Sequence, residues 1–173
     1  MNLLVLSDSH GRLSNVEEAI RRTRPDAILF AGDGLRDISR ADPPCPVFAV
    51  RGNCDTMVST VILGGVEVTP DDERCIDLDG VRILLCHGHR YGVKSTLSVA
   101  ISHAAARGAD LLVFGHTHTP TELTLLPGHG DMAASLEKPL IVLNPGSIGD
   151  GLTPSFGTIT IRGGRPLCGH GRL

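Results

Sequence analysis

The stretch Leu3–Gly11, LLVLSDSHG, joins a short apolar run directly to a polar loop that ends in glycine. The apolar run, Leu3–Leu6, is typical of a strand that is buried on both faces. A helix is expected next at Ser14–Thr23, with Ser14 as its N-cap, and a second strand at Ala27–Ala31. The order strand, helix, strand predicts a right-handed βαβ unit and a largely parallel sheet.

Short apolar runs that stop at glycine-containing loops recur along the chain. Further strands are predicted at Val47–Val50, Leu111–Phe114, Glu122–Leu126, Leu140–Leu143 and Gly157–Ile161. A β-hairpin is predicted for Arg74–Leu78 and Val81–Cys86, because the Asp-Gly pair between them favours a two-residue turn. A second helix is expected at Ser95–Arg107, with a glycine closing it. Residues 127–139 are expected to form an exposed insertion and residues 162–173 a poorly ordered tail.

The composition indicates an ordinary globular chain. Its 173 residues suit one domain, residues 1–173, and 41% of them are hydrophobic. Aromatic residues make up only 3%, so a stacking platform for single-stranded nucleic acid is not expected. With 16 basic and 19 acidic residues, the formal charge is −3, which provides no positive field for duplex DNA. A nucleic-acid partner is therefore not expected.

The cysteines and the N-terminus indicate a cytoplasmic protein. The five cysteines are odd in number and show no C-x-x-C spacing, so neither a disulfide framework nor a zinc ribbon is predicted. Reduced thiols are typical of the cytosol. The N-terminus has no basic leader, and no segment approaches the roughly 18 apolar residues of a membrane span. We therefore expect no signal peptide and no membrane partner.

Metal-ligand side chains gather in the loops that follow the predicted strands. In an open α/β sheet, these loops meet at the carboxyl edge of the strands, where ligands bind. Carboxylate, imidazole and amide groups all suit a divalent transition metal, and glycines stand beside nearly every one of them. The candidate metal ligands are Asp8, His10, Asp33, Asn53, His87, His116 and His118.

The number of candidate ligands indicates two ions. Seven donors are too many for one tetrahedral zinc, which takes four. Two ions that share one carboxylate use seven donors well, and Asp33, in the middle of the sheet, is the predicted bridge. Two metals about 3.5–4 Å apart can clamp a phosphate and activate a bridging water.

A family resemblance rests on five motifs in a fixed order: Asp8-Ser9-His10, Gly32-Asp33, Gly52-Asn53-Cys54-Asp55, His87-Gly88 and Gly115-His116-Thr117-His118. Each motif is common alone, but the ordered set resembles the calcineurin-like metallophosphoesterases. It is most similar to the small single-domain branch that also includes the retromer scaffold subunit. This resemblance implies an α/β fold, a four-layer α/β/β/α sandwich of two mixed sheets flanked by helices.

The resemblance also implies the ligand sets and the reaction. One ion would be held by Asp8, His10, Asp33 and His118, and the other by Asp33, Asn53, His87 and His116. Manganese is the metal expected, with iron, nickel or zinc as alternatives. The implied reaction is hydrolysis of a small phosphate ester, most of all a phosphodiester, by a bridging hydroxide. Relatives often form dimers or larger assemblies, so a homo-oligomer is expected.

One position departs from the family pattern. Many members carry a histidine directly after the motif asparagine, where this chain has Cys54. A thiol with an ordinary pKa of about 8.5 is a poor substitute for imidazole as a proton donor, so the general acid stays open. Asn53, Cys54 and His89 are the candidate substrate contacts, and an unchanged rate in His89→Ala would contradict the role of His89.

Two other functions remain open. A phosphomonoesterase or nucleotide phosphatase would use the same ligands on a doubly charged phosphate. A protein-binding scaffold is the second alternative, because the retromer subunit implies that this fold can serve protein contacts. A complete set of seven ligands favours the enzyme. Substrate specificity is expected to lie in the loops at residues 55–73 and 127–139.

Overall fold

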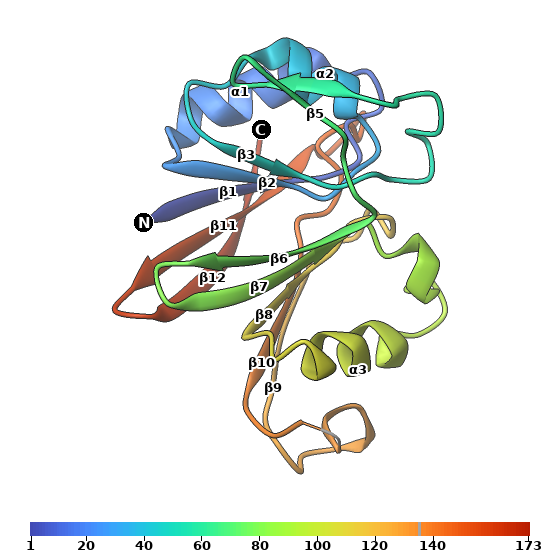
Figure 1. Cartoon of the computed structure of the whole chain (residues 1–173), viewed down its shortest axis with the longest axis vertical. Coiled ribbons are helices and arrows are strands. Elements are labelled where there is room, and N and C mark those ends of the chain that lie inside the picture. The colour runs from blue at the N-terminus through green and yellow to red at the C-terminus, as the bar shows by residue number, and fades with distance from the viewer. Residues whose placement is uncertain (135) are drawn as a thin grey trace.

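Two five-stranded mixed sheets pack face to face, and helices cover their outer faces (Figure 1). The computed structural model describes residues 1–134 and 136–173, so residue 135, within the predicted insertion, lies outside the described residues. This arrangement is the predicted four-layer sandwich. Within the described residues, no helix is long and apolar enough to cross a membrane.

The first sheet contains the predicted parallel core. In spatial order its strands are β12 (Arg165–Arg172), β11 (Ser155–Arg162), β1 (Asn2–Leu6), β2 (Ala27–Phe30) and β3 (Val47–Ala49). β1, β2 and β3 run parallel, connected by α1 (Leu13–Thr23) and α2 (Leu35–Ala41), while β11 and β12 are antiparallel. The βαβ prediction is confirmed. Both helices lie on the outer face of this sheet (Figure 1).

The second sheet contains the predicted hairpin. Its strands are, in order, β6 (Glu73–Leu78), β7 (Val81–Cys86), β8 (Leu111–Val113), β10 (Leu140–Asn144) and β9 (Thr121–Leu125). Asp79 and Gly80 join β6 to β7 with φ angles of 48° and 81°, as the predicted tight turn requires. α3 (Ser98–Ala106) connects the parallel strands β7 and β8 and covers the outer face.

The main core lies between the two sheets. Leu3 and Val5 of β1 pack there against Ile83 and Leu85 of β7, while the alternate side chains of β1 pack beneath α1 and α2. The apolar residues of β1 are therefore buried on both faces, as predicted from their unbroken run. This packing gives the loops at the ends of the strands a rigid base.

Truncation of a side chain buried between the two sheets measures how much their packing contributes to the stability of the fold. Leu111 is fully buried between the sheets, so Leu111→Ala should lower the free energy of unfolding by about 2–5 kcal/mol. Leu167 is 74% exposed on β12, and Leu167→Ala should change it by less than about 0.5 kcal/mol. Urea denaturation of both variants checks this, and equal losses would contradict the assigned core.

Several local predictions were wrong. The C-terminal tail is ordered, because β12 pairs with β11 along its whole length and Gly171 lets the backbone approach the Phe156 ring. Ser14 is not the N-cap, since α1 begins at Leu13 and no side chain caps it. α3 begins three residues later than predicted, because Ser95 donates its backbone N–H to Gly92 in a preceding turn.

Besides β12, the sequence did not predict α2 or a small separate hairpin of β4 (Val61–Leu63) and β5 (Val66–Val68). α2 spans only seven residues and depends on burial of Leu35 and Ile38. The hairpin packs on α2 through Ser39, whose hydroxyl donates to the carbonyl of Ile62 at 2.8 Å. The predicted insertion between β9 and β10 is partly buried, and a short 3-10 turn spans Asp131–Ala133.

Candidate metal centre

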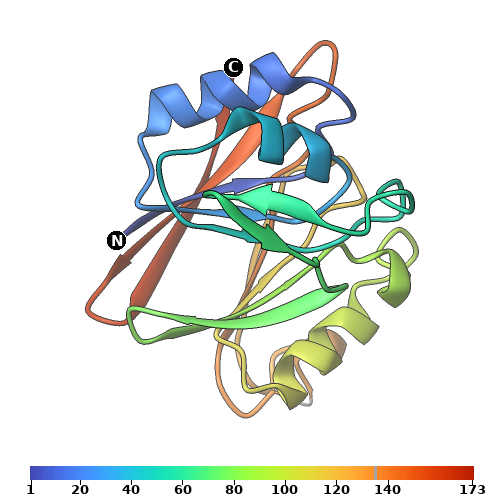
Figure 2. The same ribbon diagram turned by 45° about the horizontal axis from the view of Figure 1, so that its top comes forward.

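Five loops converge at one end of the sandwich. Asp8 follows β1, Asp33 follows β2, and Asn53 lies in the loop after β3. In the second sheet, His87 follows β7, and the loop after β8 carries His116 and His118. The seventh candidate, His10, lies two residues after Asp8. Figures 1 and 2 show that all five strands end at the same side of the molecule. The stacking of the two sheets therefore brings all seven predicted ligands into one region.

Asp8 contributes a buried oxygen that has no hydrogen-bond donor. Its Oδ2 accepts the Ser7 hydroxyl at 2.6 Å, but Oδ1 has no hydrogen-bond partner among the described residues. Oδ1 instead faces three imidazole nitrogens, the Nε2 atoms of His118 at 3.1 Å, His10 at 3.7 Å and His87 at 4.0 Å. A buried carboxylate oxygen without a donor is costly unless a cation lies beside it. This arrangement fits a metal ion.

His87 lies close to three other candidate ligands, Asp33, Asn53 and His116. Its Nε2 is 3.3 Å from Asp33 Oδ2 and 3.1 Å from Asn53 Oδ1. Its Nδ1 is 2.7 Å from the Ala31 carbonyl, which can only accept, so Nδ1 carries a proton. In the neutral ring, Nε2 is then free to bind a metal, with the carbonyl fixing the ring as an outer partner. The His116 ring lies 5.0 Å from that of His87.

The donor atoms form overlapping groups. Three sets of donors lie within 4.8 Å of one another: Asp8 with His10 and His118, Asp8 with Asp33 and His87, and His10 with Asp33 and Cys54. Asp8, His10 and Asp33 each belong to two of the three sets, so the sets overlap and form one continuous cluster. The third set includes Cys54, which the sequence did not predict as a ligand.

The backbone is strained at most of the candidate ligands. Five of the seven have positive φ angles, a conformation that non-glycine residues seldom adopt: Asp8 at 56°, His10 at 44°, Asp33 at 59°, His116 at 68° and His118 at 60°. Strain of this kind costs of the order of 1–3 kcal/mol for each residue and collects at functional sites. The surrounding structure therefore holds these side chains in place against their local preference.

Asp55 fixes the two loops that carry Asp33 and Asn53. Its buried Oδ2 accepts the backbone N–H groups of Asp33 at 2.8 Å and Gly52 at 3.0 Å, and Oδ1 accepts two more at the start of α2. The packing is tight, since a Cβ on Gly52 would lie 2.0 Å from Asp33 Oδ1. The sequence motif contained Asp55 but did not reveal this role.

Three further supporting residues were also missed. Asp37 on α2 accepts the Ser9 hydroxyl at 2.5 Å and the Gly11 N–H at 2.8 Å. After β10, Ser147 donates its hydroxyl to the Asp8 carbonyl at 2.8 Å. The Asn144 amide donates at 2.8 Å to the carbonyl before His116. Because their partners are mostly backbone groups distant in sequence, no local pattern marks them.

Burial and charge set the protonation of the site in the absence of metal. Burial would raise the pKa of Asp33, but hydrogen bonding and charge from His87 bring it below its usual value. Burial would lower the pKa of His87, but the nearby carboxylates Asp33 and Asp8 raise it. Burial and the charge of His87 lower the pKa of His116 to about 4. His116 is therefore neutral at physiological pH, as a metal ligand must be.

The three candidate substrate contacts lie beside the ligands. The Cys54 backbone N–H donates to Asp33 Oδ1 at 2.7 Å, and the Asn53 amide contacts the Cys54 sulfur at 3.3 Å. The hydrogen bond of the Cys54 thiol to Asp33, burial and the charges of nearby carboxylates raise the pKa of the thiol to about 11. The ring of His89 lies 5.4 Å from that of His87, and its buried Nδ1 has no partner among the described residues.

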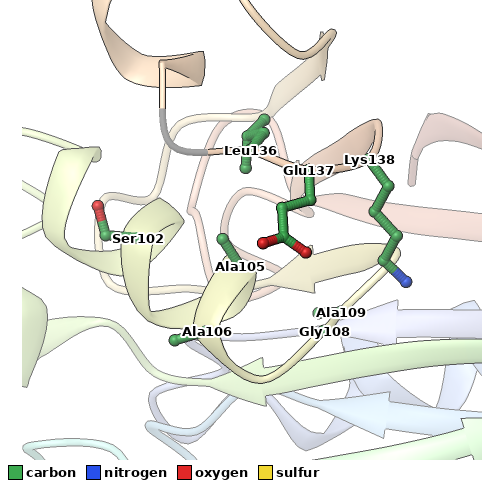
Figure 3. Close-up of a pocket in the computed structure, with 8 residues that line it drawn as sticks. All are labelled: Ser102, Ala105, Ala106, Gly108, Ala109, Leu136, Glu137 and Lys138. Atoms are coloured by element: carbon green, nitrogen blue, oxygen red, sulfur yellow. The ribbon is translucent and has the colours of Figure 1, made fainter.

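Another hollow lies away from the candidate ligands. It has a volume of about 610 Å³ between the end of α3 and residues 136–138, where Ser102 and Ala105 face Glu137 (Figure 3). Ala109, also in its wall, precedes β8, whereas His116 follows that strand. The hollow is therefore at the opposite edge of the second sheet and is not part of the metal-ligand cluster.

Comparison with known proteins identifies the family. Residues 1–164 match the family model described as the calcineurin-like phosphoesterase superfamily domain. The chain belongs to this superfamily. The match covers all five loops with their seven candidate ligands, and members of the superfamily are metal-dependent enzymes that act on phosphate esters. The resemblance drawn from the motifs is confirmed.

Individual relatives agree with this assignment. The chain is 30% identical over 149 residues to a probable metallophosphoesterase, YsnB, of Bacillus subtilis, covering 86% of this chain and 75% of that one. It is 30% identical over 139 residues to the phosphodiesterase YfcE of Escherichia coli, covering 69% and 71%. An archaeal phosphodiesterase structure has a TM-score of 0.68 at 20% identity over the full length of both chains.

A second solved structure extends the likeness in fold. Vacuolar protein sorting 29 of Cryptosporidium parvum has a TM-score of 0.67 at 16% identity, with 99% of this chain and 97% of that one covered. The fold class predicted from the sequence is thereby confirmed.

Proposed function

We propose that this chain is a dinuclear metal-dependent phosphodiesterase. The observation that carries the proposal is the buried Oδ1 of Asp8, which has no hydrogen-bond donor among the residues that the structure describes and faces three imidazole nitrogens. The ligand sets proposed are those implied by the family resemblance, with Asp33 shared between the ions. Manganese is the metal we propose, with iron, nickel or zinc as alternatives.

When bound, two ions would supply Lewis-acid chemistry, acidifying a water molecule and neutralising charge on the phosphoryl oxygens. The chain's own residues hold this arrangement rigid. Asp55 and Asp37 anchor the loops of Asp33 and His10 through backbone hydrogen bonds. The exposed amide of Asn53 is in position to meet a phosphoryl oxygen at the mouth of the site.

The similarity to the phosphodiesterase YfcE supports a diester as substrate, and the chemistry of Cys54 supports a good leaving group. The raised pKa of Cys54 keeps its thiol protonated at neutral pH, and so weak an acid is a poor donor to a leaving group. Esters with good leaving groups are then the best substrates. The phosphodiesterase YfcE of Escherichia coli is similar to this chain along most of its length. We also propose a cytoplasmic location and a small phosphate ester as substrate, with a homo-oligomer as the assembly.

Hydrolysis of p-nitrophenyl esters tests the proposal. Protein stripped of metal and refilled with manganese should hydrolyse bis-p-nitrophenyl phosphate at least about tenfold faster than p-nitrophenyl phosphate, and stripped protein should hydrolyse neither. Faster turnover of the monoester would favour the phosphomonoesterase alternative. Failure to hydrolyse either ester with manganese, iron, nickel or zinc would sink the enzymatic proposal and leave a protein-binding scaffold as the remaining function.

A further inference from the structure

A hollow lined by segments that follow Asp33 and Asn53 in the chain contains two arginines, which have no ionic partner within the described residues. It has a volume of about 420 Å³ and lies between α2 and the loop that leads into β4. Arg36 and Arg40 line it from α2, and Met57 and Glu67 line it from the other side. α2 and β4 are in contact, and Figure 2 shows the hairpin beside this helix.

Both walls of this hollow begin at candidate metal ligands. Arg36 lies three residues after Asp33, and Met57 lies four residues after Asn53. The two walls are tied together at their base, because Asp55 accepts the backbone N–H groups of Asp33 and Leu35 while its own carbonyl accepts the Val58 N–H at 2.9 Å. Asp55 therefore connects both walls of the hollow to the loops that carry Asp33 and Asn53.

The charges in the hollow favour an anion. Arg36 and Arg40 are one helical turn apart, so their side chains project from the same face of α2. Both arginines are exposed, and like several other arginines of the chain they differ from Arg21, Arg22, Arg82, Arg90 and Arg107, which form ion pairs. Within the described residues, neither Arg36 nor Arg40 has a carboxylate within 4.0 Å. Glu67 is the one carboxylate in the lining, against two guanidinium groups.

Met57 adds an apolar surface at the same place. Its side chain is 85% exposed, although contact with water does not stabilise an apolar methionine side chain. Because Met57 follows Asn53 by four residues and lines the same hollow as the arginines, it suits the uncharged body of a ligand that spans both sites. A thioether also makes favourable contacts with an aromatic ring, such as a nucleobase.

From these observations we propose that Arg36 and Arg40 form a second anion subsite, and that the substrate is a phosphodiester with an additional phosphate group. This inference rests on the proposed function and specifies its substrate class. The ester phosphate lies at the metal centre, the body of the substrate lies against Met57, and the additional phosphate binds the two guanidinium groups. Guanidinium groups bind phosphate oxygens through charge-assisted hydrogen bonds.

A matched pair of substrates tests this subsite. Thymidine 5′-(p-nitrophenyl phosphate) and its 3′-phosphorylated form share the same scissile bond and differ only in the additional phosphate. With manganese-loaded protein, the 3′-phosphorylated form should have a KM at least about tenfold lower. Arg36→Gln and Arg40→Gln should each reduce this preference about three- to tenfold and leave kcat unchanged. Glu67→Gln should increase the preference, because it removes the opposing charge.

Two controls keep the outcomes distinct. Arg165→Gln removes an exposed arginine at the start of β12 and should leave the preference unchanged. Calorimetric binding of thymidine 3′,5′-bisphosphate against thymidine 5′-monophosphate should show the same order without turnover. If the protein hydrolysed neither ester, the proposed function would be contradicted. The subsite would then be decided by which of the two nucleotides binds more tightly in calorimetry. Equal KM values for both esters, or a preference that survives replacement of both arginines, would overturn the subsite alone.

Discussion

Replacement of Asp33 by asparagine is expected to lower the rate of diester hydrolysis by at least about a thousandfold. The Asp33 carboxylate belongs to two of the three donor groups, and in the proposed ligand sets it is shared by both ions, so its charge would act on both. Loss of a shared ligand costs several kcal/mol of transition-state stabilisation, and each 1.4 kcal/mol is about a tenfold loss in rate. Asparagine keeps an oxygen that can accept the Cys54 N–H, so the loop should remain folded.

Steady-state hydrolysis of bis-p-nitrophenyl phosphate with manganese measures this effect. Asp77→Asn is the matched control, because Asp77 pairs with Arg82 on the exposed surface of the β6–β7 hairpin. It should keep the rate within about twofold, since exposed ion pairs contribute about 1 kcal/mol or less to stability and none to the site. Full turnover in Asp33→Asn would contradict the assignment of the shared ligand.

Replacement of Asp55 by asparagine is expected to have the largest effect on stability among the polar residues at the site. The carboxylate accepts four backbone N–H groups, two on each oxygen. An asparagine would point its amide N–H₂ at two of these donors and leave them unsatisfied. Hydrogen bonds to a charged group contribute about 1.5–3 kcal/mol each, so the free energy of unfolding should fall by about 3 kcal/mol or more.

Urea denaturation of Asp55→Asn checks this, with Asp79→Asn as the control. Asp79 lies in the turn between β6 and β7 with a positive φ angle, which asparagine tolerates well. The control should change the free energy of unfolding by less than about 0.5 kcal/mol. If Asp55→Asn unfolded with the free energy of the unchanged protein, Asp55 would not hold the two loops.

The sequence predicted the parallel strands and the site loops for clear physical reasons, whereas the two-sheet sandwich was expected only from the family resemblance. Unbroken apolar runs such as Leu3–Leu6 mark strands that are buried on both faces, and these strands form the centres of the sheets. Donor side chains next to glycines mark the ends of those strands. Parallel pairing of β1, β2 and β3 then brings the loops together with no further information.

The elements that the sequence did not predict are stabilised by distant partners. α2 is short and has Asp37 bonded to Ser9 and Gly11, while β12 depends on pairing with β11. The residues that hold the loops from behind, such as Asp55, act through backbone groups of other segments. A single sequence shows the type of such a residue but not the segment that folds against it.

The central claim is that the seven candidate ligands hold two ions, and metal stoichiometry tests it most directly. Protein stripped of metal, dialysed to equilibrium against manganese and analysed for metal content should contain two ions per chain. The same measurement on Asp33→Asn should give one ion or fewer. A content of one ion or none per unaltered chain, at manganese concentrations far above those needed for activity, would contradict the dinuclear centre.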